Sequence, residues 1–212
     1  MIGVFADPRH LRVGGRPLFL VYRPADLPDA RRTVELLRNE CVKGGLPEPY
    51  LIGLNAHKEL DCRTLGFDGT LNYEPQFGVL GGALADGLKV YDYAMGRQLT
   101  MGRKRDYRGY PCIFVSWDNT ARRGENAIVV VNSTPEAFEA GLRQIVQSVQ
   151  DKPYDDRLVF INAWNEWAEG NYLEPDQRHG LKYLEAVQRV NCLEVPRSLR
   201  SIGENSHPEV NP

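Results

Sequence analysis

The chain contains 212 residues, of which 42% are hydrophobic and 25% are charged, and its formal net charge is −2. That length suits a single domain with its own core, and the charge argues against nucleic acid as a partner, because phosphate-binding surfaces are usually basic. No apolar run approaches the roughly 18 residues that span a bilayer, and no signal peptide opens the chain. We therefore expect a cytoplasmic protein without a transmembrane segment.

In chain order, strand-like and helix-like segments alternate. The sequence predicts a strand at 17–22, a helix at 29–43, strands at 50–54 and 67–73, a glycine-rich loop at 78–82, a helix at 91–99, strands at 112–115 and 128–131, a helix capped by Thr134, a strand at 158–161 and a closing helix at 181–190. Residues 1–192 are expected to form one domain, and residues 193–212 a polar, disordered tail.

Alternating strands and helices predict an α/β fold with a parallel sheet covered by helices. The five main predicted strands also end in polar or aromatic groups, as the catalytic strands of a (β/α) barrel do at their carboxyl ends. A doubly wound nucleotide-binding fold is disfavoured, since residues 78–82 lack the G-x-G-x-x-G spacing. The strand ends are Tyr22-Arg23, Asn55-Ala56-His57, Tyr73-Glu74, Trp117-Asp118-Asn119 and Trp164-Asn165-Glu166-Trp167.

No metal or other cofactor is expected. The four cysteines, Cys41, Cys62, Cys112 and Cys192, lie far apart with no C-x-x-C pair, and the histidines show no ligand spacing. Buried free thiols are favoured over disulfides or a metal site.

The segment 160–170 carries the strongest chemical signal in the chain. A strand-like run leads directly into two tryptophans, two asparagines and two carboxylates. The faces of sugar rings stack on tryptophan, and paired carboxyl groups supply acid and base to a glycosidic oxygen. The structural alternative is a strand end with tryptophans in the core and glutamates in solvent.

These residues also carry a family resemblance. The blocks 7–24, 117–123, 132–135 and 164–187 resemble, in order, motifs of the WbsX-type glycosyltransferase domain, which is related to the endo-α-mannosidases of glycoside hydrolase family 99. Members of that family resemble complete barrels, whereas here the central strand motif follows Met1 almost directly. The resemblance therefore implies the C-terminal portion of a (β/α)8 TIM-like barrel, with about five βα units. An upstream polypeptide would complete it, or the chain would be an inactive fragment.

The related hydrolases imply roles for the two glutamates. Glu166 is expected to deprotonate the 2-hydroxyl of the sugar, which attacks the anomeric carbon, and Glu169 to protonate the leaving oxygen and later activate water. Residues three apart on a helical turn place their Cβ atoms roughly 5–6 Å apart, which suits carboxyl groups flanking one sugar. Their mutual repulsion should raise one pKa.

Supporting roles follow from the strand ends. The predicted substrate-binding residues are Tyr22, Arg23, Trp117, Asp118, Asn119, Arg122, Trp164, Asn165, Trp167 and Glu174, with Glu74 a weaker candidate. For the tryptophans the alternative is core packing, for Asp118 and Asn119 a turn after a strand, and for Arg122 a solvated basic loop. If the protein is a transferase, Arg122 would receive a donor pyrophosphate.

The sequence thus favours a carbohydrate-active domain acting in bacterial surface polysaccharide metabolism, on lipopolysaccharide O-antigen or capsule. Whether the protein is a transferase or a hydrolase remains open, because the two chemistries differ only in whether a sugar hydroxyl or water accepts the glycosyl group. A metal-dependent donor site is disfavoured, since no Asp-x-Asp motif occurs. The alternative from another class is a non-catalytic sugar-binding or assembly subunit.

Overall fold

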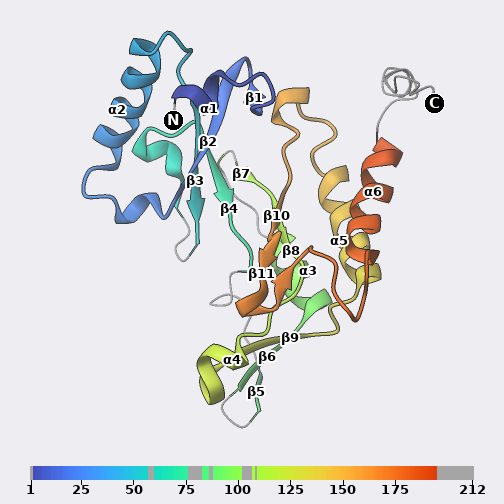
Figure 1. Ribbon diagram of the computed structural model, residues 1–212. Helices are drawn as coiled ribbons and strands as arrows, with labels where there is room; N and C mark the ends of the chain where they lie inside the picture. The colour runs from blue at the N-terminus through green and yellow to red at the C-terminus, as the bar shows by residue number, and fades with distance from the viewer. Residues whose placement is uncertain are drawn as a thin grey trace, which may run out of the picture.

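The computed structural model describes residues 2–56, 60–75, 83–85, 88–101, 107 and 109–194. His57 and most of the predicted tail lie outside these residues, so the tail remains a prediction. The described chain forms a mixed α/β fold around a curled sheet (Figure 1).

The sheet runs in the order β1-β2-β3-β4-β7, with β2, β3, β4 and β7 parallel and β1 antiparallel at one edge. Beyond Pro111 the chain continues from β7 into β8, which pairs in parallel with β10. All five predicted main strands are therefore present and parallel. The seven strands named in this paragraph are β1 Arg12–Val13, β2 Arg16–Tyr22, β3 Tyr50–Asn55, β4 Gly69–Asn72, β7 Gly109–Tyr110, β8 Cys112–Phe114 and β10 Phe160–Asn162.

One end of the sheet is covered by α2 (Ala30–Lys43), which begins where the Asp29 carboxylate accepts a hydrogen bond from Arg32 N. Val34 of this helix packs with Leu51 of β3. Strand β3 is buried at nearly every position, as its apolar sequence requires. Gly53 permits this packing, because a Cβ there would lie 2.6 Å from Cys62 Sγ.

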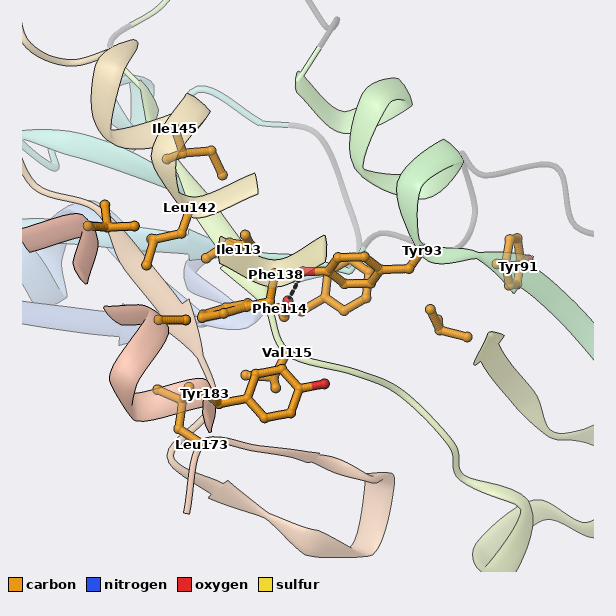
Figure 2. Packing of buried hydrophobic residues seen from close by; sticks show 13 residues of the cluster. Tyr91, Tyr93, Ile113, Phe114, Val115, Phe138, Leu142, Ile145, Leu173 and Tyr183 are labelled. Carbon is orange, nitrogen blue, oxygen red and sulfur yellow. Dashed lines mark hydrogen bonds between the residues drawn. The ribbon is translucent and has the colours of Figure 1, made fainter. Parts of the chain in front are cut away.

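The other end is covered by α5 (Pro135–Gln147) and α6 (Lys182–Glu194), which pack against each other and against β8 (Figure 2). Thr134 caps α5 as predicted, accepting a hydrogen bond from Ala137 N at 3.2 Å. Phe138 is fully buried, and its ring meets that of Tyr183 edge to face at 5.6 Å. This is the largest apolar cluster of the described residues.

Three features differ from the sequence-based expectation. The run 128–131 forms β9 (Ile128–Val131), but it pairs with β6 (Leu88–Asp92) in a separate small sheet with β5 (Ala83–Ala85). The helix predicted at 91–99 is α3 (Tyr93–Met101), so its first two residues belong to β6. Between β3 and β4 the described chain has only the 3-10 helix η2 (Cys62–Leu65).

The remaining elements are short. They are α1 Ile2–Ala6, η1 Pro24–Asp26, α4 Thr120–Arg123, η4 Gly124–Asn126, η5 Tyr154–Asp156, β11 Asn165–Glu166, η6 Trp167–Glu169 and β12 Asn171–Tyr172. Cys41, Cys62 and Cys112 are buried free thiols, as expected. Within the described residues, no helix is both long and apolar enough to cross a membrane.

Candidate active site

The two glutamates of the 160–170 segment lie on a tight hairpin beyond the carboxyl end of β10. Glu166 ends β11, which pairs antiparallel with β12, and Glu169 ends the 3-10 turn η6 that joins them. The predicted helical turn is thus a 3-10 turn. Glu166 precedes this turn as its N-cap, with φ −82° and ψ 65°, so the two glutamates are held by the hairpin and not by regular helical geometry.

Glycine closes this turn against the neighbouring loop. Gly170 has φ +60°, and a Cβ there would lie 3.1 Å from Asp118 N. Asp118 N in turn donates to the Glu169 carbonyl oxygen at 2.8 Å. The backbone of the glutamate turn is therefore fixed directly to the loop that follows β8.

Glu169 is the more buried of the two carboxylates, and it forms an ion pair across that loop. Arg122 Nη1 donates to Glu169 Oε1 at 2.7 Å. Burial raises the pKa of Glu169 above its ordinary value; Arg122 and Arg123 counteract this rise, and the charge of Glu166 adds to it. Glu166 is exposed. The environment thus favours Glu169 as the carboxyl group that holds a proton.

Two of the three tryptophans are at the surface. Trp164 is 53% exposed and Trp167 is 48% exposed, so neither is a core residue. The Trp167 ring stacks on Tyr172 with centroids 3.7 Å apart, and its Nε1 donates to Glu174 Oε2 at 2.5 Å. Trp167 and Glu174, two of the predicted substrate-binding residues, are therefore in direct contact.

The side chains of the loop after β8 are held mainly by contacts with other protein groups. Trp117 is half-buried and packs against the α5–α6 core. The Asp118 carboxylate accepts from Thr120 N at 2.9 Å, and Asn119, which is 4% exposed, accepts from Ile128 N at 2.8 Å. These contacts favour a structural role for Asn119, while Asp118 remains exposed beside the glutamate turn.

Tyr22 and Arg23 end β2, as predicted. Tyr22 is 56% exposed, and its ring lies 6.2 Å from that of Tyr73. Arg23 has φ 52° and pairs with Asp26 of η1, so its guanidinium is engaged locally. Asn165 is exposed on β11, opposite Tyr172.

The sequence-based list of substrate-binding residues does not include Tyr73, Asn162 or Tyr172, although Tyr73 and Asn162 lie at predicted strand ends. The Tyr73 hydroxyl donates to Asn162 Oδ1 at 2.8 Å, and Asn162 Nδ2 donates to the carbonyl oxygen of Glu74, a residue only 2% exposed. Burial raises the pKa of Tyr73 to about 12, with Glu166 and Glu169 adding to the rise. The position of Tyr73 directly after β4 was the one signal in the sequence that pointed to this residue.

The arrangement offers a half-buried carboxyl group with a raised pKa, a second, exposed carboxyl group and two exposed indole rings on one short hairpin. These are groups suited to binding and protonating a sugar. Among the residues that the structure describes, no three His, Cys, Asp or Glu side chains are grouped so as to hold a metal ion.

Residues 1–187 match the sequence profile of the family described as "Glycosyltransferase WbsX". The chain belongs to the WbsX glycosyltransferase family. It is 35% identical over 193 residues to the uncharacterized protein WxcX of Xanthomonas campestris pv. campestris, in each of two strains. That match covers 86% of this chain but 28% of the relative, so the chain spans less than a third of the curated relatives' length.

Two solved structures resemble this WbsX-family chain in fold. One, a glycoside hydrolase-like protein, has a TM-score of 0.56 at 13% identity, and the match covers 87% of this chain and 56% of that protein's chain. The other is the family 99 endo-α-mannosidase of Bacteroides thetaiotaomicron, with a TM-score of 0.52 at 16% identity, covering 90% of this chain and 60% of its own. At these identities the similarity establishes the fold: a mixed α/β architecture with a curled, half-barrel sheet.

Proposed function

We propose that the chain supplies the catalytic face of a carbohydrate-active enzyme that makes or cleaves glycosidic bonds in bacterial surface polysaccharide, either lipopolysaccharide O-antigen or capsule. The substrate class is a glycan. Membership of the WbsX family supports sugar chemistry, and the fold shared with family 99 supports both transfer and hydrolysis.

One observation carries the proposal. Glu166 and Glu169 share a turn fixed to the β8 loop, and burial raises the pKa of Glu169 despite its ion pair with Arg122. A carboxyl group with a raised pKa beside a second carboxylate suits acid–base work on a glycosidic oxygen. Exposed Trp164 and Trp167 flank them as stacking surfaces.

The chemistry follows the family 99 resemblance. Glu166 takes the proton of the sugar 2-hydroxyl as that oxygen bonds to the anomeric carbon, while Glu169 gives its proton to the departing glycosidic oxygen. In the second step Glu169 takes a proton from water or from an acceptor hydroxyl. The new oxygen then bonds to the anomeric carbon, the bond to the 2-oxygen breaks, and Glu166 returns the proton to it. The net result is retention, with water giving hydrolysis and a hydroxyl giving transfer.

Residues 1–192 are proposed to form the C-terminal part of a (β/α)8 barrel with about five βα units. The five parallel strands β2, β3, β4, β7–β8 and β10 support this arrangement. A separate upstream polypeptide has no support in the comparisons and stays a prediction, as does a cytoplasmic location.

The test compares Glu166→Gln and Glu169→Gln in the full-length protein. Removal of a positioned acid or base should lower kcat by about 10²–10⁴-fold with the fold intact. Turnover is followed on surface polysaccharide of the encoding organism and on α-mannan oligosaccharides, by reducing ends and by chain extension. Glu35→Gln, an exposed glutamate on α2, is the matched control.

The same variants separate catalysis from binding alone. A non-catalytic sugar-binding subunit would show no turnover in the wild type and nearly unchanged glycan affinity in Glu166→Gln. Full activity in both glutamine variants would rule out the proposed acid–base pair.

A further inference from the structure

A hollow adjoins the glutamate turn on the side of the β12–α6 loop. It has a volume of about 550 Å³ and is open to solvent. That volume lies within the range of small-molecule sites. Its lining residues are Trp167, Tyr172, Pro175, Asp176, Gln177 and Arg178.

The aromatic wall of this hollow is fixed before any ligand arrives. Trp167 and Tyr172 stack with an interplanar angle of 15°, and the indole Nε1–H is held by Glu174. An indole fixed in this way loses little conformational entropy when a ring packs on it. The Trp167 indole therefore offers a rigid, solvent-exposed surface on which a sugar ring can stack.

The loop that carries the polar wall is also tied down. Leu173 is buried in the α5–α6 core, and its N–H donates to the carbonyl oxygens of Ala163 and Trp164. Further along, Gly180 N donates to Asp176 O at 2.9 Å, which closes the loop on itself. The hollow is therefore part of the same hairpin framework that holds the glutamates.

The polar groups of the hollow are chemically varied. Burial raises the pKa of Asp176, but hydrogen bonds from His179 N and the Tyr172 hydroxyl outweigh it and leave the pKa below its ordinary value, so the group is a carboxylate at neutral pH. Gln177 and Arg178 are exposed at the rim. One carboxylate, one guanidinium and one amide provide donors and acceptors with no net charge.

We propose that this hollow is a second sugar subsite, which binds a neutral pyranose unit of the glycan next to the unit held by Glu166 and Glu169. The inference rests on the proposed function. A pyranose matches the hollow because it combines an apolar face for the Trp167–Tyr172 pair with hydroxyls for Asp176, Gln177 and Arg178. A charged sugar is disfavoured, because it would face a carboxylate and a guanidinium together.

The test is binding without turnover, in the full-length protein carrying Glu169→Gln and 5-fluorotryptophan. The probes are mannose, glucose, galactose, N-acetylglucosamine, rhamnose and fucose, added singly up to high millimolar concentration. The fluorine resonance of Trp167, assigned with Trp167→Phe, should shift saturably with at least one sugar.

Variants decide where that sugar sits. Gln177→Ala with Arg178→Ala should weaken its affinity by about tenfold, since each lost hydrogen bond is worth roughly threefold to tenfold. Arg32→Ala, an exposed arginine on α2, should leave it unchanged. The subsite is refuted if no sugar shifts the resonance, or if the double variant binds as tightly as its parent.

Failure of the subsite is distinguishable from failure of the proposed function. The subsite is judged by affinity in a background without turnover, whereas the acid–base pair is judged by turnover in Glu166→Gln with Gln177 and Arg178 intact. Either result can be negative while the other is positive.

Discussion

At the scale of single residues, the contact between Arg122 and Glu169 joins positions 47 apart in the sequence. The sequence places Glu166, Glu169 and their neighbouring tryptophans together because they are contiguous. It gives no sign that Arg122 reaches Glu169, since ion-pair partners across loops depend on how the loops fold. The ion pair places the Arg122 guanidinium at Glu169, which favours a role at the site over a solvated basic loop.

Arg122→Gln should shift the pH dependence of activity. The guanidinium lowers the pKa of Glu169, so its removal lets that pKa rise further. Because the first step needs Glu169 protonated, the alkaline limb of the kcat/KM profile should move to higher pH. Arg123→Gln, whose charge has the weakest effect of those acting on Glu169, should give a smaller shift. A limb that stays in place or moves to lower pH would contradict the assignment of Glu169 as the acid.

At the scale of elements, Asn171 connects the glutamate hairpin to the strand beneath it. It is fully buried in β12, and its Oδ1 accepts from Val115 N at 3.0 Å and Ser116 N at 3.3 Å, just beyond β8. One side chain therefore fastens the β11–β12 hairpin to the loop that carries Asp118.

Asn171→Ala should loosen this hairpin. The substitution removes the acceptor of the part-buried Ser116 N–H, which costs about 1–3 kcal/mol, whereas Val115 N keeps the Asn162 carbonyl oxygen at 3.1 Å. Amide hydrogen exchange of peptides covering residues 163–173 should accelerate by about tenfold for each 1.4 kcal/mol lost. Asn165→Ala, on the exposed partner strand, is the comparison. Equal protection in the two variants would mean that Asn171 does not anchor the hairpin.

The hairpin and the strands β5 and β6 were the elements that sequence patterns did not predict; β9 was predicted as a strand, but not its pairing in a separate sheet. The strands β5, β11 and β12 have only two or three residues, too few to show alternation, and the pairing of β6 with β9 depends on contacts distant in sequence. The predicted helix start at Tyr91 was wrong because apolar Val90 and Tyr91 fit a strand equally well. Tertiary pairing with β9 decided the outcome.

At the scale of the whole molecule, the five main strands and the helices α2, α5 and α6 were predictable. Long apolar runs, Asp29 and Thr134 as caps, and the stripe containing Phe138 are local signals with direct structural consequences. The curl of the sheet was expected from the strand ends and the family resemblance, whereas the passage from β7 to β8 at Pro111 has no local signal, because it arises from how whole strands pack.

Phe138→Ala should destabilise this framework as a unit. The ring is fully buried where α5 meets Tyr183 of α6, and truncating such a side chain costs about 3–5 kcal/mol. The thermal midpoint of the unit containing these helices should fall by about 6 °C or more. Leu181→Ala, at a side chain 55% exposed, should change it little. A similar loss in both variants would contradict the assigned core.

The placement of the indole rings has an optical consequence. The chain has three tryptophans, two exposed on the glutamate hairpin and the third, Trp117, on the adjoining loop, while the α5–α6 core is built around tyrosine and phenylalanine. Ultraviolet emission excited selectively in tryptophan therefore arises, in this chain, from the glutamate hairpin and the loop beside it. Through Trp164 and Trp167 its intensity and wavelength would report changes at that hairpin, and through Trp117, which packs against the α5–α6 core, they would also respond to repacking of the helices.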